Sequence, residues 1–133
     1  MSDQYLLDTH AILFWYTRNQ NEASEEFFEF FDKQDQFGTL KVSAISFLEI
    51  ALLTKKGKIQ ISNLHQWQSR LIEKTKLEIL NPNPEELINS VFLPDHHKDP
   101  FDRILIVQSI RHSLILVTKD SEIKKYALST FWI

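Results

Sequence analysis

The sequence of 133 residues contains no cysteine and only two glycines, Gly38 and Gly57. Without cysteine there is no disulfide framework, no thiolate zinc site and no cysteine nucleophile. The glycines lie far apart, which excludes the glycine-rich loop of Walker-type and Rossmann-type nucleotide binders. No apolar run reaches the roughly 18 residues of a membrane helix, and the first residues are polar, unlike a secretory signal. We therefore expect a cytoplasmic protein without a membrane segment.

Hydrophobic residues are plentiful enough to build a core. They make up 43% of the chain, and aromatic residues make up 12%. A chain of this length is typical of one domain. Because the sequence has no internal repeat, low-complexity stretch or evident linker, it predicts a single domain over residues 1–133.

Charge is unevenly distributed along the chain, although the formal net charge is only −3. Residues 22–35 carry six acids and one base, whereas residues 37–76 carry seven bases and two acids. These segments form either two solvated faces of opposite sign or a basic shoulder beside an active site. The net charge does not exclude a nucleic-acid partner, because the local distribution of charge governs such binding.

Short apolar runs alternate with amphipathic segments. The expected strands are 5–7, 40–42, 77–80, 114–117 and, at the end, 130–132. The expected helices are 11–16 (capped by Asp8 or Thr9), 24–31, 43–53 (with Gly57 as C-cap), 64–72, one that opens at Pro84, 102–112 and a short one over 121–126. This alternation predicts an α/β fold of three layers with a mostly parallel central sheet.

Acidic residues lie where such a sheet would bind a ligand, at the carboxyl ends of its strands. Asp8 ends the first strand, and Asp120 lies just past the strand over 114–117. Glu49 interrupts an apolar helix, and Asp102 begins another. The fold could therefore bring four carboxylates from distant parts of the chain together.

A cluster of carboxylates requires a compensating charge. Two unit charges about 4 Å apart repel by roughly 4 kcal/mol at an effective dielectric of about 20. Carboxylates in a cluster therefore take up protons or bind a cation. Their oxygens are ligands that Mg²⁺ and Mn²⁺ prefer, and such an ion activates water and stabilises charge on phosphoryl and leaving oxygens. The chemistry indicated is hydrolysis of a phosphodiester.

Each acid taken alone also has a simpler structural role. Asp8 and Asp120 could cap the helices that follow them, and Glu49 could be a partly exposed helix residue. Asp102 could interact with the helix dipole or with Arg103. The spacing of the acids leaves this choice open.

Four segments, in order, resemble the motifs of PIN-domain ribonucleases, particularly the VapC-type toxins of bacterial toxin–antitoxin pairs. They are residues 6–11 (LLDTHA), 42–53 (VSAISFLEIALL) with the basic tail 55–59 (KKGKI), 99–106 (DPFDRILI) and 116–120 (LVTKD). Together they span nearly the whole chain. The resemblance implies a three-layer α/β/α PIN-like fold and a metal-dependent endoribonuclease that leaves 5′-phosphate and 3′-hydroxyl ends.

The resemblance also implies roles for the acids. Asp8, Glu49 and Asp102 would be the core ligands of one or two Mg²⁺ or Mn²⁺ ions. Asp120 would complete the second metal position or hold a metal-bound water. Asp99 fits the third position less well, because Asp102 has the family-like distance to the strand that ends at Val117.

Other polar residues would support this site. Thr9 and Thr118 would orient a carboxylate through their hydroxyls. The loop that holds His96, His97 and Lys98 is expected to be solvated and to meet RNA phosphate rather than metal, and His10 is expected to pack near the site. The candidates to hold the RNA backbone are Lys55, Lys56, Lys58, Arg103 and Lys119.

The implied partners are an RNA substrate, a cognate antitoxin that lies in the acidic groove, and a second copy of the chain in a homodimer. Aromatic residues could supply an interface, although at least half of them are expected in the core. These residues are Phe27, Phe28, Phe30, Phe31 and Phe37.

Three other functions compete with this hypothesis. A haloacid-dehalogenase-like phosphatase needs a second aspartate two residues after the first, and His10 occupies that position. A nuclease of DNA flaps needs arch and clamp elements for which this chain is too short. A non-catalytic relative, which keeps the acids but only binds metal or RNA, stays open as the alternative.

Overall fold

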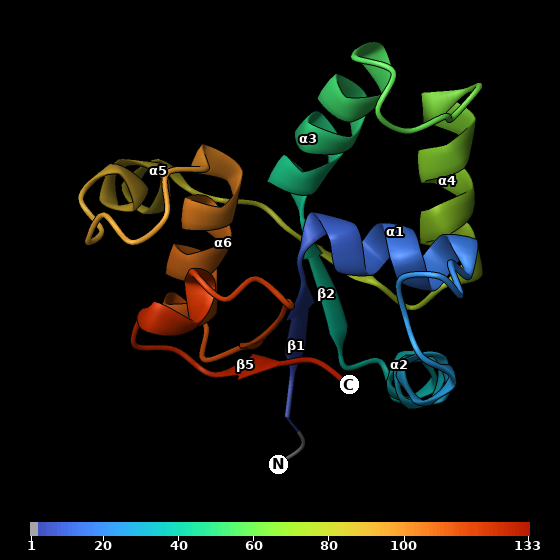
Figure 1. Cartoon of the computed structure of the whole chain (residues 1–133), viewed down its shortest axis with the longest axis horizontal. Coiled ribbons are helices and arrows are strands. Elements are labelled where there is room, and N and C mark those ends of the chain that lie inside the picture. Colours follow the sequence, from blue (N-terminus) through green and yellow to red (C-terminus); the bar gives the residue numbers. More distant parts are fainter. Residues whose placement is uncertain (1–2) are drawn as a thin grey trace.

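The computed structural model describes residues 3–133 and consists of a central sheet with helices on both faces (Figure 1). The strands follow the order β3-β2-β1-β4-β5, and every neighbouring pair is parallel. They are β1 (Tyr5–Leu7), β2 (Leu40–Ser43), β3 (Glu78–Leu80), β4 (Ile115–Val117) and β5 (Thr130–Phe131). This confirms the predicted three-layer α/β/α fold with a mostly parallel sheet. That residues 1–133 form one domain stays a prediction.

The helices are divided between the two faces of the sheet. They are α1 (Thr9–Thr17), α2 (Glu25–Phe37), α3 (Ala44–Lys55), α4 (Leu64–Lys74), α5 (Pro84–Val91), α6 (Pro100–Arg111) and the 3₁₀ helix η1 (Ile123–Lys125). Figure 1 shows α1, α2 and α4 on one side and α5 and α6 on the other, while α3 extends away from the end of β2. Within residues 3–133, no helix is both long and apolar enough to cross a membrane.

The core is divided into two clusters because successive residues of a strand point to opposite faces of the sheet. Leu7 of β1 and Val117 of β4 belong to the larger cluster, under α1 and α2. Their neighbours Leu6 and Leu116 belong to the smaller cluster, under α6. Both faces of β1 and β4 are therefore buried, as the apolar sequences of these strands indicate.

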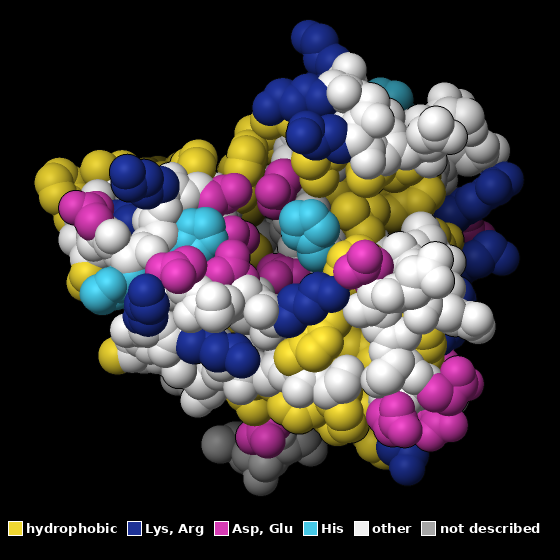
Figure 2. Space-filling view, in the orientation of Figure 1, with side chains coloured by type: hydrophobic (Ala, Val, Ile, Leu, Met, Phe, Trp, Pro, Cys, Tyr) yellow, Lys and Arg dark blue, Asp and Glu magenta, His cyan; other side chains and the backbone are white. Residues whose placement is uncertain are grey.

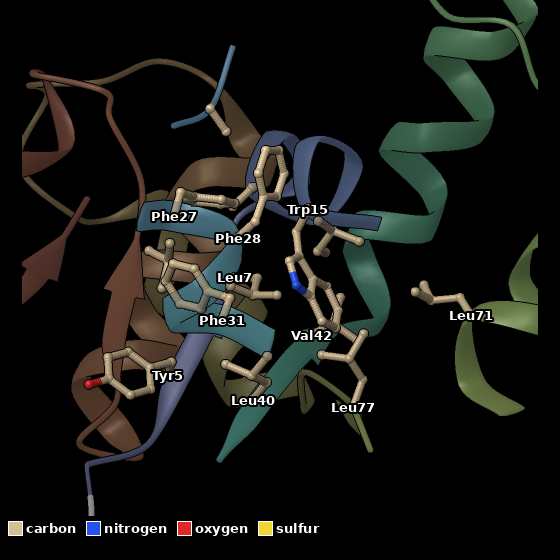
Figure 3. Packing of buried hydrophobic residues seen from close by; sticks show 14 residues of the cluster. Tyr5, Leu7, Trp15, Phe27, Phe28, Phe31, Leu40, Val42, Leu71 and Leu77 are labelled. Carbon is tan, nitrogen blue, oxygen red and sulfur yellow. The ribbon is translucent and has the colours of Figure 1, made fainter. Parts of the chain in front are cut away.

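Aromatic residues of α2 fill much of the larger cluster (Figure 3). Phe27, Phe28 and Phe31 are buried, and Phe30 packs against the same cluster. Phe37 alone among these five is largely exposed, at 66%. The expectation that at least half of these phenylalanines belong to the core is confirmed.

Two predicted helices differ most clearly from the structure in where they end. The helix expected over 24–31 continues to Phe37 and ends at Gly38, which has a φ of 72° that favours glycine. The helix expected over 121–126 is only the single turn of η1, because Tyr126 leaves the helical conformation with a ψ of 159°. The side chain of Tyr126 is buried, and its hydroxyl donates to the carbonyl oxygen of Pro94, which lies 32 residues earlier in the chain.

Candidate active site

The predicted acids lie at the edge of the sheet where the parallel strands end. Asp8 directly follows β1, and Asp120 follows the adjacent strand β4. From β1 the chain proceeds to β2 on one side and returns later to β4 on the other, so the two acids flank the point where the strand order reverses, a usual ligand position in such sheets. Glu49 comes to this edge on α3, and Asp102 on the first turn of α6. Figure 2 shows acidic and histidine side chains gathered in a hollow there, with basic side chains around it.

Asp8 serves both as a helix cap and as a buried acid of this cluster. Its side chain is 7% exposed, and one carboxylate oxygen accepts the backbone N–H of Ala11 at 2.7 Å, which caps α1. Burial raises the pKa of Asp8, against the lowering effect of its hydrogen bonds with Thr118 and Ala11; the charge of Glu49 raises the pKa further. The cap that the sequence left as an alternative therefore exists, and it does not remove Asp8 from the cluster.

Asp102 is the acid with the strongest electrostatic conflict. Burial raises its pKa from an ordinary 3.8 to about 7, and the charges of Asp99, Asp8 and Glu49 act in the same direction. The nearby His97 acts in the opposite direction without outweighing them. Asp99 itself caps α6 by accepting the backbone N–H groups of Phe101 and Asp102. The cluster thus carries more negative charge than its own neighbours neutralise, and a cation would remove this conflict.

Glu49 provides an independent sign of a missing partner. Its Oε1 atom is buried and accepts no hydrogen bond from any group in residues 3–133. A buried carboxylate oxygen without a donor is costly, because it has lost its hydration and gained nothing in return. A divalent cation held by oxygen ligands satisfies such an atom, so Glu49 fits a metal site beside Asp8 and Asp102.

Asp120 lies in a more hydrated part of the cluster. Its partial burial raises its pKa, but the N–H of Glu122, at 2.8 Å, and the His97 side chain lower the pKa more, so its pKa is below the usual value. The backbone N–H of Asp120 also donates to the hydroxyl oxygen of Thr118 at 3.2 Å. The buried Thr118 side chain is also close enough to Asp8 to lower the pKa of Asp8, so it lies between the acids that follow β1 and β4.

His97 lies inside the cluster, which the sequence did not predict. Its Nε2 atom is 3.0 Å from Oδ2 of Asp102 and 3.0 Å from Oδ2 of Asp120, and its side chain is only 15% exposed. The expectation of a solvated loop was therefore wrong for His97, although His96 beside it is exposed. The sequence offered one indication that His97 lies at the site, its position five residues before Asp102. This spacing does not predict a contact unless the path of the loop is known.

Three of these side chains, His97, Asp102 and Asp120, lie close enough together to share a divalent cation, whereas Asp8 and Glu49 do not belong to that group in residues 3–133. One potential ligand atom from each of His97, Asp102 and Asp120 lies within 4.8 Å of the other two. Asp8 and Glu49 are close enough to alter the pKa of Asp102. Oxygen-rich sets of this kind suit Mg²⁺ and Mn²⁺, and the unpartnered oxygen of Glu49 agrees with this choice.

Comparison with known proteins agrees with this geometry. A model of the PIN domain family matches residues 5–128. The chain belongs to the PIN domain family. The resemblance of its four sequence motifs to that family is thereby confirmed.

A ribonuclease is similar to this PIN domain in sequence, and chains of toxin–antitoxin complexes are similar to it in fold. Ribonuclease VapC22 of Mycobacterium tuberculosis (strain ATCC 25618 / H37Rv) is 28% identical over 123 residues, which cover 91% of this chain and 90% of the relative. One chain of the crystal structure of VapBC2 from Rickettsia felis, bound to a DNA fragment from their promoter, has a TM-score of 0.70 at 19% identity and covers 97% of this chain and 98% of its own. DNA-bound VapBC from Salmonella typhimurium gives a TM-score of 0.68 at 15% identity, with 98% of each chain covered. The structural likeness shows the same fold.

Three of the basic residues that were expected to bind RNA lie at the C-terminal end of α3, away from the sheet where this helix begins. Lys55 ends this helix, and Lys56 and Lys58 follow it on either side of Gly57. All three lysines are exposed. The C-cap of α3 is Lys56 rather than the predicted Gly57, which follows it with a φ of 74° that favours glycine.

Arg103 does not have the expected role in this PIN domain. It is 7% exposed, and its guanidinium donates to backbone carbonyls around it. The acceptors are the carbonyl oxygens of Ser90, Val91, Leu93, Pro94 and His97. The prediction of an RNA contact at Arg103 was wrong, because its guanidinium is buried and bound to the carbonyls of a surrounding loop. The sequence does not show this burial.

Lys119 and Thr9 also have surroundings that the sequence did not indicate. The ammonium of Lys119 is 3.0 Å from a carboxylate oxygen of Glu22 and lies over the Phe14 ring, 5.0 Å from its centroid. Its charge is therefore already paired with an acid. The hydroxyl of Thr9 is buried and makes no hydrogen bond within residues 3–133, whereas His10 is exposed and packs on Phe14.

Proposed function

We propose that this PIN domain is a metal-dependent endoribonuclease of the VapC toxin type. The observation that carries the proposal is the group of carboxylates from three separate elements, the buried Asp8 and the partly buried Glu49 and Asp102, whose burial and negative charges raise the pKa of Asp8 and Asp102. The relationship to Ribonuclease VapC22 supports RNA as the substrate. A cation held by carboxylates, acting on a nucleic acid, is suited to the hydrolysis of phosphodiester bonds.

The residues divide into those that would hold the ion and those that would hold RNA. Asp8, Glu49 and Asp102 would be the core ligands of Mg²⁺ or Mn²⁺, and Asp120 would complete a second position. When bound, the ion would supply a positive charge that activates water and stabilises the phosphate oxygens during hydrolysis to 5′-phosphate and 3′-hydroxyl ends. The Thr118 hydroxyl, which lowers the pKa of Asp8, would orient this carboxylate behind the ion.

The RNA backbone would lie against the lysines at the end of α3. Lys55, Lys56 and Lys58 are exposed, and no ion pair involves them among residues 3–133. They can therefore approach phosphate without losing an acidic partner. Lys119 would first have to leave Glu22, so we assign it a lesser part.

The proposed partners follow from the same relationships. The neighbours in fold come from VapBC complexes bound to DNA, which supports a cognate antitoxin for this chain and a dimeric assembly. An antitoxin that silences the enzyme would cover the acidic hollow. The cytoplasm, where RNA would be encountered, is the proposed location.

Cleavage of RNA with and without EDTA tests the proposal. Wild type should cleave total RNA in Mg²⁺ or Mn²⁺ and lose this activity in EDTA, and Asp8→Asn should be inactive under both conditions. Asparagine caps a helix about as well as aspartate, so Asp8→Asn should keep α1 and the fold. Glu49→Gln should also be inactive, whereas Glu29→Gln, an exposed position on α2, is the matched control and should cleave normally.

Two results would decide against this function. Full cleavage by Asp8→Asn, or by wild type in EDTA, would show that the carboxylates do not carry the reaction. Binding of metal and RNA by wild type with no cleavage in either metal would instead support the non-catalytic relative.

A further inference from the structure

The loop before α6 is held in place from both sides. The Tyr126 hydroxyl accepts the backbone N–H groups of His96, at 3.2 Å, and His97, at 3.0 Å. Arg103 donates to the carbonyl of His97 at 2.7 Å. Because Tyr126 and Arg103 are both 7% exposed, the backbone of His97 is anchored to buried groups. The position of the His97 ring in the acidic cluster is therefore built into the fold.

The hydrogen bonds of the His97 ring determine which nitrogen carries the proton. Nδ1 lies 3.1 Å from the backbone nitrogen of Asp99. A backbone N–H can only donate, so Nδ1 must accept and has no proton. In a neutral imidazole the proton then lies on Nε2, which faces the carboxylates of Asp102 and Asp120.

This arrangement makes His97 a donor to the metal-binding carboxylates rather than a ligand. A ligand nitrogen needs a free lone pair, and the proton on Nε2 occupies it. The hydrogen bond of Nε2 is with Oδ2 of Asp120, with Oδ2 of Asp102 at the same distance. The other oxygen of Asp120 accepts the N–H of Glu122, so the two bonds together fix the orientation of its carboxylate.

We propose that His97 is a positioning residue that holds Asp120 beside Asp102 through its Nε2–H group, so that both carboxylates are ready to bind the ion. This inference rests on the proposed function, since it concerns the same site. Asp120 and Asp102 lie on different elements, a loop after β4 and helix α6. Groups that orient metal ligands in this way commonly contribute about 10- to 100-fold to metal affinity.

Binding of Mn²⁺ alone, measured by calorimetry on the full chain, tests this proposal. His97→Ala should weaken Mn²⁺ binding about 10- to 100-fold. His97→Gln carries an amide N–H at nearly the reach of Nε2 and should restore most of the affinity. His97→Asn, whose amide reaches only as far as Nδ1, should not restore it. The glutamine and asparagine variants differ by one methylene, so a general loss of folding cannot explain a difference between them.

His96→Gln is the matched control, because His96 is the exposed neighbour in the same loop and should bind Mn²⁺ as wild type does. Nitrogen NMR of the His97 ring supplies a second measurement, independent of affinity. We expect a proton on Nε2 and none on Nδ1, both without metal and in saturating Mg²⁺. With Mn²⁺, electron spin resonance should show no directly coordinated imidazole nitrogen.

The possible outcomes separate this inference from the proposed function. Three results would overturn the proposed role of His97 and leave the metal site in place. They are wild-type affinity for Mn²⁺ in His97→Ala, a proton on Nδ1 of His97, and direct coupling of an imidazole nitrogen to Mn²⁺. Absence of Mn²⁺ binding by wild type, or unchanged binding in Asp102→Asn, would overturn the metal site itself.

Discussion

The raised pKa of Asp102 reflects its burial and the repulsion among the carboxylates of the site. Its carboxyl group is partly buried on the first turn of α6, close to Asp99 and Asp8. The helix dipole favours a negative charge at this position, by up to about 1 kcal/mol at a typical exposed site. Burial and like charges outweigh this benefit, since the pKa of Asp102 is raised to about 7. In the absence of metal, the folded protein therefore holds a proton on this group near neutral pH.

This raised pKa predicts how the stability of the metal-free protein depends on pH. Between the ordinary pKa of 3.8 and about 7, the folded state binds a proton at Asp102 that the unfolded state has released, so the group's contribution to stability falls as pH rises. Asp102→Asn removes this loss. The unfolding free energy of the variant relative to wild type, measured with urea in EDTA, should increase from pH 5 to pH 8 by at most about 3 kcal/mol. A difference independent of pH would contradict the electrostatic account of Asp102.

The start of α6 and the loop before it form one unit at the scale of elements. Arg103, on the first turns of α6, binds carbonyls from the end of α5 and along the loop that leads to α6. The same arginine therefore fixes the path of the chain that carries His97 and Asp99 to the site. This loop has no helix or strand of its own, and the several hydrogen bonds that it accepts from one buried guanidinium hold its backbone in place.

Replacement of Arg103 should destabilise the protein strongly. Arg103→Met keeps much of the side-chain volume but leaves several buried carbonyls without donors, and we expect a loss of about 2–4 kcal/mol in unfolding free energy. Arg111→Met, an exposed position on the same helix, should change it by about 0.5 kcal/mol or less. Chemical denaturation of both variants measures this, and equal effects would argue against the role of Arg103 in the loop.

The end of α3 is the second element with a testable role. Replacement of Lys55, Lys56 and Lys58 by Gln in the Glu49→Gln background should weaken RNA binding and make it less sensitive to salt. Each lost phosphate contact should lower the slope of log affinity against log salt by about 0.7 for single-stranded RNA. Lys33→Gln, on α2, is the control and should leave the slope unchanged. An unaltered slope in the triple variant would place the RNA path elsewhere.

At the scale of the whole molecule, an ion in the acidic hollow would join segments that are far apart in the chain. Asp8, Glu49 and Asp102 come from the end of β1, from α3 and from α6. No such set exists in the unfolded chain, so binding of the ion should stabilise the folded state. A metal ion bound there would thus be a tertiary cross-link as well as part of the proposed chemistry.

Thermal unfolding should therefore respond to metal. At an ion concentration about 100 times the dissociation constant, the folded state gains about 2.7 kcal/mol, which should raise the melting temperature of wild type by several degrees. Asp102→Asn should show a much smaller rise in Mg²⁺ or Mn²⁺. The same rise in both proteins would mean that the ion stabilises the fold from another site.

The sequence by itself determined the strands, most of the helices and the neighbourhood of the acids. Continuous apolar runs such as residues 114–117 identify strands buried on both faces, and Asp8 lies directly after such a run. Because parallel strands end at the same edge of a sheet, the sequence could predict that the fold brings Asp8 and Asp120 to one edge. That β1 and β4 are adjacent strands there comes from the tertiary structure.

Only the tertiary structure decided which polar residues outside the strands face the site. His97 and His96 are adjacent and identical in type, yet one lies among the acids and the other is exposed. Arg103 was expected to hold the RNA backbone, but it is buried and donates to the carbonyls of a loop. Strand and helix periods follow from local backbone geometry, which the sequence encodes over a few residues. The direction of a loop side chain depends on distant groups such as Tyr126, whose contacts form only when the chain has folded.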